Sequence, residues 1–190
     1  IANPVELAEN VCSGSFSLVE KDGSPAPEKR YYIVQPPLIP GNGFKKTAEQ
    51  EASEFLPKLV INNESFIAFC KSRRAVEVVL KESKDALKDY LGDYSGLIAG
   101  YRGGYKPEER KEIENNMVKG TLKGLISTNA LEVGIDIGKI DNTVIVGYPG
   151  TRASFWQQSG RAGRSGKAAS TFLILANLPF DQYIAIDNEW

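Results

Sequence analysis

The sequence predicts an α/β protein with a doubly wound, mostly parallel sheet that carries helices on both faces. Two observations predict this fold class. From residue 66 onward, short apolar runs alternate with longer segments of helical pattern, as in strands joined by crossover helices. The strand-like runs are apolar throughout, as expected for parallel strands that are buried on both sides. In a sheet of this kind, functional loops lie at the carboxyl ends of the strands.

The individual elements follow from local signals. The apolar, β-prone runs predict strands at 66–70, 97–99, 122–127, 143–148 and 171–175. Ser72 is a good N-cap for the helix after the first of these strands, and Pro107 and Gly120 mark the beginning and end of another helix. Further helices are predicted at 45–59, 153–158 and 179–186.

Residues 1–45 have a less regular pattern than the rest of the chain. They contain a predicted short helix at 5–11, a predicted strand at 16–19 and a β-prone run at 31–34. We expect this segment to be an irregular appendage, and residues 46–190 to form the α/β domain. Neither end of the chain has the features of a natural terminus, so we expect a fragment of a larger protein.

The charge balance excludes a globally basic nucleic-acid binder. The 190 residues include 23 Lys and Arg and 24 Asp and Glu, which gives a net charge of −1. Any binding to nucleic acid must therefore use a local patch. One such patch exists, because no Asp or Glu lies between Asn142 and Phe180, whereas four basic residues do: Arg152, Arg161, Arg164 and Lys167.

The inventory of metal-binding residues is small. The chain has two cysteines, Cys12 and Cys70, and no histidine, so we expect no metal site. Cys70 ends an apolar run and is predicted to be a buried free thiol. A chain with only two cysteines, one of them predicted to be a buried free thiol, is compatible with a reducing cytosol, and we expect a cytoplasmic protein. No apolar run approaches the roughly 18–20 residues of a membrane span, so we expect no membrane association.

Residues 157–164 read Q-Q-S-G-R-A-G-R and contain the strongest chemical signal in the chain. A guanidinium group is always charged and binds phosphate through two parallel hydrogen bonds. The spacing of three predicts that Arg161 and Arg164 lie on one side of a helical turn, where the glycines leave room for a ligand. This arrangement suits the charge that develops during phosphoryl transfer. Taken alone, the run also fits a solvated basic loop.

The 157–164 run resembles motif VI of the superfamily 2 helicases, and residues 127–138 resemble motif V, which precedes it in that family. Within the superfamily, residues 128–132 and 147–151 look most like the DEAD/DEAH-box DNA helicases of the YprA-like group, which carry a C-terminal zinc-binding domain. DEAD-box RNA helicases usually begin motif VI with His-Arg, whereas this chain has Gln157-Gln158. The resemblance implies a C-terminal RecA-like helicase domain.

The resemblance also implies roles for individual residues. In motif VI, Arg164 and Arg161 would act on the ATP phosphates as catalytic residues, and Gln157 would help to arrange the site. In motif V, Gly134 and Asp136 would bind the nucleotide, with the carboxylate accepting a hydrogen bond from the ribose. The residues that would contact the nucleic-acid backbone are Ser72, Arg73, Arg102, Gly103, Thr128 and Asn129.

The chain contains neither a G-x-x-x-x-G-K-[ST] phosphate loop nor a D-E-x-x motif after a strand. In the family, these motifs belong to a first RecA-like domain. The resemblance therefore implies that ATP and Mg²⁺ bind mainly to that absent domain, and that the chain alone hydrolyses no ATP. The implied partners are the backbone of single-stranded DNA and the first RecA-like domain of the same polypeptide.

The expected function is that of the second motor domain of an ATP-dependent DNA helicase. Two alternatives stay open from the sequence: a non-catalytic nucleic-acid-binding module that uses the basic stretch at 152–167, and one half of an RNA helicase. A small-molecule enzyme is disfavoured, because the chain has no histidine and no visible nucleophile–base pair.

Overall fold

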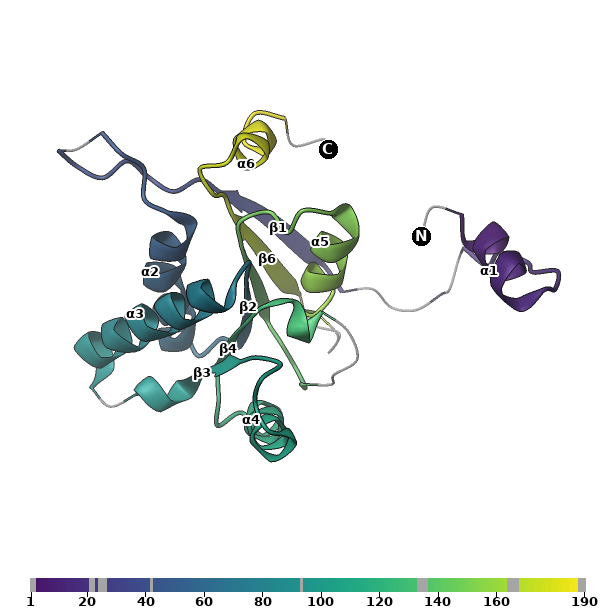
Figure 1. The fold of residues 1–190 in the computed structure, drawn as a ribbon. Coiled ribbons are helices and arrows are strands. Elements are labelled where there is room, and N and C mark those ends of the chain that lie inside the picture. Colours follow the sequence, from purple (N-terminus) through teal and green to yellow (C-terminus); the bar gives the residue numbers. More distant parts are fainter. Residues whose placement is uncertain are drawn as a thin grey trace.

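The computed structural model describes residues 3–187, apart from 21–22, 24–26, 42, 93, 133–136 and 164–167. Its centre is one six-stranded sheet with the strand order β1-β6-β5-β2-β4-β3, in which each neighbouring pair is parallel. Helices cover both faces of this sheet (Figure 1). The predicted fold class, a doubly wound α/β domain with a parallel sheet, is confirmed.

The strands are β1 (Lys29–Val34), β2 (Phe66–Cys70), β3 (Ile98–Tyr101), β4 (Gly124–Ser127), β5 (Asn142–Val146) and β6 (Ala169–Ile174). The helices are α1 (Pro4–Cys12), α2 (Ala48–Ile61), α3 (Arg73–Leu91), α4 (Pro107–Lys119), α5 (Arg152–Ser159) and α6 (Pro179–Ile184). Two short 3-10 helices, Ser95–Leu97 and Asn129–Leu131, complete the elements of the described chain. Most of the predicted helices and strands begin and end within a few residues of these bounds.

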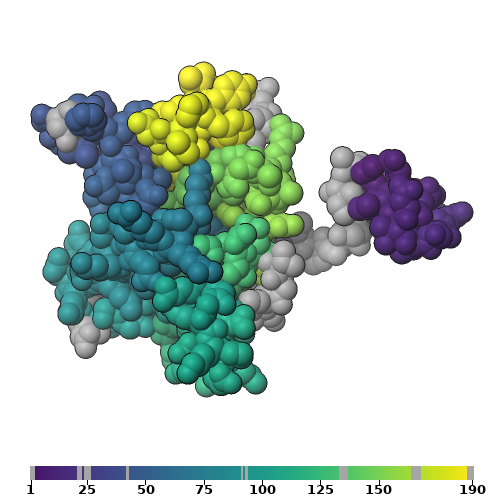
Figure 2. All heavy atoms as spheres, viewed as in Figure 1, coloured from purple at the N-terminus to yellow at the C-terminus, as the bar shows by residue number. Residues whose placement is uncertain are grey.

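The N-terminal segment differs from its prediction in two ways. β1 lies inside residues 1–45 and pairs with β6 along its whole length, so the sheet begins at Lys29 rather than after residue 45. The strand predicted at 16–19 is wrong: these exposed residues form no strand, because no neighbouring strand offers them hydrogen bonds or burial. α1 buries none of its residues and stands apart from the sheet (Figures 1 and 2).

Alternate residues of the central strand point to opposite faces and so build two cores. From β2, Phe66, Ala68 and Cys70 pack with α2 and α3, whereas Ile67 and Phe69 pack with residues of α4 and of the loop after β4. Every residue of β2 is buried, as the unbroken apolar run predicted. A third, smaller core lies under α5 and α6.

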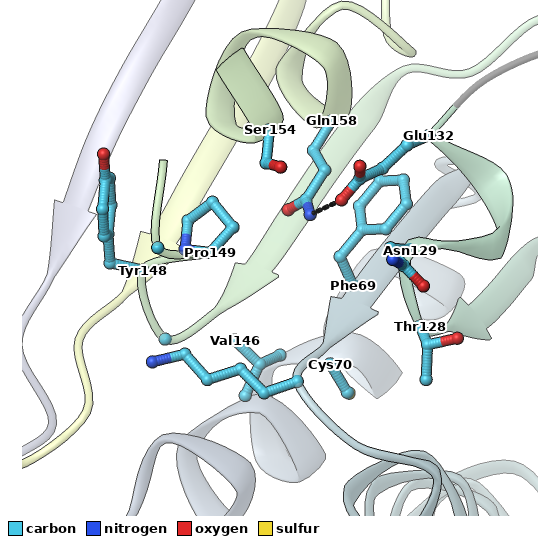
Figure 3. A pocket seen from close by; sticks show the side chains of 13 residues that line it. Phe69, Cys70, Thr128, Asn129, Glu132, Val146, Tyr148, Pro149, Ser154 and Gln158 are labelled. Carbon is cyan, nitrogen blue, oxygen red and sulfur yellow. Dashed lines mark hydrogen bonds between the residues drawn. The ribbon is translucent and has the colours of Figure 1, made fainter. Parts of the chain in front are cut away.

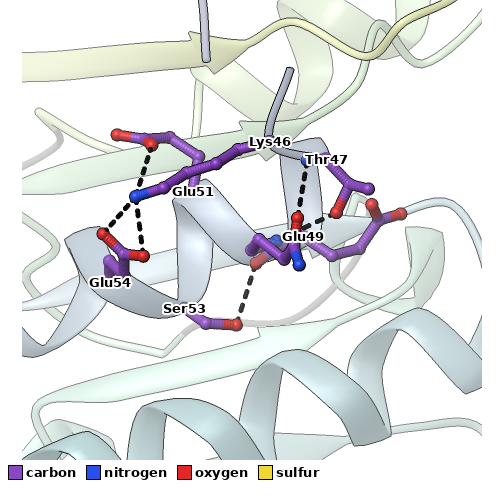
Figure 4. Close-up of polar contacts among 7 residues, drawn as sticks. Lys46, Thr47, Glu49, Glu51, Ser53 and Glu54 are labelled. Carbon is purple, nitrogen blue, oxygen red and sulfur yellow. Dashed lines mark hydrogen bonds and ion pairs between the residues drawn. The ribbon is translucent and has the colours of Figure 1, made fainter. Parts of the chain in front are cut away.

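α2 begins with a reciprocal capping arrangement (Figure 4). The Thr47 hydroxyl accepts a hydrogen bond from the Gln50 amide at 3.2 Å, and the Gln50 side chain accepts one from the Thr47 amide at 2.9 Å. Two of the N–H groups that a helix start leaves free are thereby satisfied. Lys46 adds an ion pair with Glu54, with 2.6 Å between Nζ and Oε2. These contacts fix the start of the helix at Ala48, three residues later than predicted.

Gly124 of β4 gives a test of how closely the central strands pack. A Cβ added there would lie 2.1 Å from the ring of Phe66, which is fully buried. We expect Gly124→Ala to lower the free energy of unfolding by about 1–3 kcal/mol, because the ring has no space to move. Urea denaturation measures this change. Gly96→Ala is the control, because its new Cβ would meet no atom within 4 Å. A Gly124→Ala variant as stable as the control would contradict the packing.

Candidate nucleic-acid and nucleotide interface

A polar pocket of about 410 Å³ opens at the carboxyl ends of the three central strands (Figure 3). β2 contributes Lys71, which follows its last residue, and β4 contributes the loop with Thr128 and Asn129. β5 contributes the 147–150 loop, and α5 closes one side with Ser154 and Gln158. The pocket therefore lies where a doubly wound sheet was expected to hold its functional loops.

Thr128 and Asn129 both line this pocket. The sequence predicted that they follow the end of a strand. Thr128 is half-buried and precedes the 3-10 helix Asn129–Leu131, whereas the Asn129 side chain is exposed. A hydroxyl group and an amide are typical partners for the phosphate and sugar oxygens of a nucleic-acid backbone. The structure thus brings together two of the six residues predicted to contact nucleic acid.

Lys71 was not predicted to belong to the site. It lines the pocket, and its ammonium group lies 3.8 Å from the Asp181 carboxylate. Gly147 makes room for it: a Cβ on Gly147 would lie 2.9 Å from Lys71 Cε, and the φ of +76° also favours glycine. Its position could have been predicted from the sequence, because Lys71 directly follows β2 and therefore lies at the same edge of the sheet as Thr128.

Asp181 of α6 holds two backbone segments next to the pocket in place. Its side chain is 2% exposed, and Oδ2 accepts hydrogen bonds from the backbone N–H of Tyr148 at 2.9 Å and of Ala176 at 2.8 Å. A buried carboxylate of this kind is stabilised by charge-assisted hydrogen bonds. It ties the loop after β5 to the loop after β6. No local pattern in the sequence marks this role.

Ser72 and Arg73 flank the pocket at the start of α3. The Ser72 hydroxyl accepts a hydrogen bond from the Ala75 amide at 3.1 Å, so the predicted N-cap is confirmed. Both side chains are exposed, and neither lines the pocket. Their predicted contacts with a nucleic-acid backbone stay predictions.

Arg102 and Gly103 lie away from this pocket, beside β3 and α4. The Arg102 guanidinium lies 2.5 Å from the Glu77 carboxylate and 5.0 Å from the centre of the Tyr105 ring. Gly103 is in an exposed turn. An ion pair between partly exposed side chains contributes at most about 1 kcal/mol, so a phosphate group can replace Glu77 as the partner of Arg102.

The structure distinguishes the two neighbouring glutamines of motif VI. Gln157, the residue predicted to help arrange the site, is exposed and does not line the pocket. Gln158 is only 4% exposed, and its Nε2 donates a hydrogen bond to Glu132 Oε1 at 2.6 Å (Figure 3). Adjacent helical residues point in different directions, and the motif alone did not show which one faces inward.

The two arginines of motif VI were expected to lie on one side of a helical turn. Arg164 lies outside the described residues, and Arg161 lies beyond the end of the helix. α5 ends at Ser159, and the chain continues through Gly160 into a turn in which Gly163 has a φ of +82°. Arg161 is 5% exposed and donates from both Nε and Nη2 to the backbone carbonyl of Glu132, with 3.1 Å between Nε and that oxygen.

Three predicted site residues, Gly134, Asp136 and Arg164, lie outside the described residues. Among the residues that are described, no three His, Cys, Asp or Glu side chains gather in a group that could hold a metal ion. Nor does this part of the chain contain a helix with the length and apolarity to cross a bilayer.

The parallel sheet, the polar pocket at its carboxyl edge and the Gly-Arg motif beside it define a RecA-like domain of the type that helicases use. The chain belongs to the helicase conserved C-terminal domain family, whose model matches residues 51–166. The resemblance to the C-terminal RecA-like domain of superfamily 2 helicases is thereby confirmed.

Individual relatives agree with this family. The chain is 40% identical over 192 aligned residues to the uncharacterized ATP-dependent helicase YprA of Bacillus subtilis, covering 100% of this chain and 25% of that protein. It is 39% identical over 186 residues to the ATP-dependent helicase HRQ1 of Saccharomyces cerevisiae, covering 96% of this chain and 17% of that protein.

A solved structure of the DUF1998 helicase MrfA bound to DNA is similar over 100% of this chain and 26% of its own, with a TM-score of 0.90 and 39% identity. The chain therefore spans about a quarter or less of the length of these relatives.

The two thiols provide a test of the pocket's packing. Cys70 is buried and Cys12 is exposed, and neither forms a disulfide. Burial, with a smaller contribution from Glu49, raises the pKa of the Cys70 thiol to about 12. At pH 8, Cys70 therefore carries almost no thiolate, and we expect a thiol reagent such as DTNB to modify only Cys12 in the native protein.

The measurement is the number of thiols that react before and after urea unfolding. We expect one and then two, and none before unfolding in a Cys12→Ser variant. Two rapidly reacting thiols in the native protein would show that Cys70 is accessible from the pocket.

Proposed function

We propose that this chain is the second motor domain of an ATP-dependent DNA helicase, and that it supplies single-strand backbone contacts and an arginine finger. The observation that carries the proposal is the pocket at the carboxyl edge, which is lined both by the motif V residues Thr128 and Asn129 and by Gln158 of motif VI. The names of YprA and HRQ1, and the DNA in the MrfA structure, support it.

The strand-binding side would use the polar and basic groups along this edge. Thr128, Asn129 and Lys71 line the pocket, and the exposed residues Ser72 and Arg73 follow Lys71 at the start of α3. Free N–H groups at a helix start favour phosphate. A further contact would come from Arg102 and Gly103 at the far end of the sheet. Because backbone contacts carry no sequence information, we expect binding without preference for particular bases.

The nucleotide side would face a first RecA-like domain in the longer polypeptide. That domain would hold most of the ATP and Mg²⁺, because this chain has no phosphate loop and no metal-binding group among its described residues. Arg164 would reach the γ-phosphate, with Arg161 beside it, and Gln157 would help to arrange the site. Gly134 and Asp136 would approach the ribose. A guanidinium at the transferring phosphoryl group stabilises the charge of the transition state.

Arg164→Ala in the longer protein tests the arginine finger. Arginine fingers contribute about 10³–10⁵ in rate, so we expect a steep loss of ATP turnover with saturating single-stranded DNA. Binding of DNA without nucleotide should change little. Arg164→Lys should recover little activity, because an ammonium group cannot make the forked contact. A rate for Arg164→Ala within about twofold of wild type would exclude this role.

Arg73→Ala tests the strand-binding side. We expect weaker binding to single-stranded DNA by a similar factor for all base sequences, and a smaller dependence of the binding constant on salt. Fluorescence anisotropy with homopolymer and mixed oligonucleotides at several salt concentrations measures both quantities. Lys81→Ala, an exposed change further along α3, is the matched control. A loss confined to one base sequence would indicate base readout instead.

A further inference from the structure

We propose that Glu132 is a positioning residue that couples the strand-binding side of the pocket to the arginines of motif VI. This inference rests on the proposed function and assigns to one residue the link between the two halves of the site. Glu132 lies immediately after the 3-10 helix Asn129–Leu131 and lines the pocket.

The first contact joins Glu132 to α5. The Glu132 carboxylate accepts the hydrogen bond from Gln158 Nε2 at 2.6 Å, and Gln158 is 4% exposed. A hydrogen bond to a charged acceptor in a buried place is stronger than a neutral one, and its loss leaves a polar group without compensation. The position of the Glu132 side chain is therefore closely tied to that of α5.

The second contact joins Glu132 to the arginine motif. Both Nε and Nη2 of Arg161 donate to the backbone carbonyl of Glu132. Arg161 is 5% exposed, and a buried guanidinium needs such acceptors to offset the loss of water. The turn from Gly160 to Gly163 is thereby anchored on Glu132.

The third contact joins Glu132 to the strand-binding loop. Its backbone N–H donates to the Asn129 carbonyl at 3.0 Å. In the described part of the chain, Gln158 Oε1 has no hydrogen-bond partner and is turned toward the pocket (Figure 3).

The three contacts together link the two sides of the site. If Asn129 shifts when a nucleic-acid strand binds, Glu132 moves with it, and so do α5 and the turn that holds Arg161. A chain of partly buried hydrogen bonds of this kind can carry energy between two sites.

The test exchanges the donor and the acceptor of one hydrogen bond in the longer protein. Gln158→Glu places two carboxylates against each other and breaks the contact. Adding Glu132→Gln restores it with the roles reversed, because the new amide at position 132 would then donate to the new carboxylate at position 158. Glu132→Gln alone keeps an acceptor for Gln158. Asn115→Asp makes the same amide-to-carboxylate change at an exposed position of α4 and serves as the control.

The quantity measured is the ratio of ATP turnover with saturating single-stranded DNA to turnover without DNA, together with the melting temperature and the DNA dissociation constant. We expect Gln158→Glu to lower this ratio about tenfold, and the double variant to recover most of it. Glu132→Gln replaces a charged acceptor with a weaker, neutral one, so it should lower the ratio less than Gln158→Glu. Asn115→Asp should keep the wild-type ratio. If Gln158→Glu does not fold, Glu132→Ala replaces it and should lower the ratio, because it removes the acceptor without adding a charge.

Four results distinguish a failure of the proposed function from a failure of the role of Glu132. A wild-type ratio near one would refute the proposed function itself. A stimulated wild type whose ratio is unchanged by Gln158→Glu, or a double variant as low as Gln158→Glu, would overturn only the role of Glu132. A fall in melting temperature that matches the fall in the ratio across all variants would also overturn it, because Glu132 would then stabilise the fold without coupling the sites.

Discussion

The common direction of the strands is the constraint on which the rest of the structure depends. Because each neighbouring pair is parallel, the carboxyl ends of β2, β4 and β5 meet at one edge of the sheet. The register aligns Phe69 with Ser127 and Cys70 with Val146. Loops that are distant in the sequence therefore converge on one pocket, and a short motif after each strand is enough to build it.

The sequence predicted most of the fold because the central strands are buried on both sides. β2 reads as an unbroken apolar run, and Ser72 behind it is a strong cap signal. The edge of the sheet was harder to predict. β1 has exposed or half-buried residues throughout, so its composition shows a strand but not its partner. Its pairing with β6 joins residues some 140 positions apart, which local pattern cannot reveal.

The site was predicted only in part, for a related reason. Thr128 and Asn129 follow a predicted strand, so their place at the pocket follows from topology. Glu132 and Asp181 act through partly or fully buried hydrogen bonds that exist only in the folded chain. The motif also gave no means to distinguish Gln157 from Gln158, because helix phase and burial decide which glutamine faces inward. For Arg161, the motif predicted a charged group near phosphate. It did not predict that the guanidinium donates hydrogen bonds to the backbone carbonyl of Glu132.

The most direct test of the central claim is hydrogen exchange of the longer protein with and without single-stranded DNA. We expect slower exchange of backbone amides at the carboxyl edge, in residues 128–132 and 147–150. We expect no change in the loops at the opposite edge, residues 62–65, 120–123 and 138–141. Protection at the opposite edge, with none at the carboxyl edge, would contradict the assignment of this pocket as the strand-binding side of a helicase motor domain.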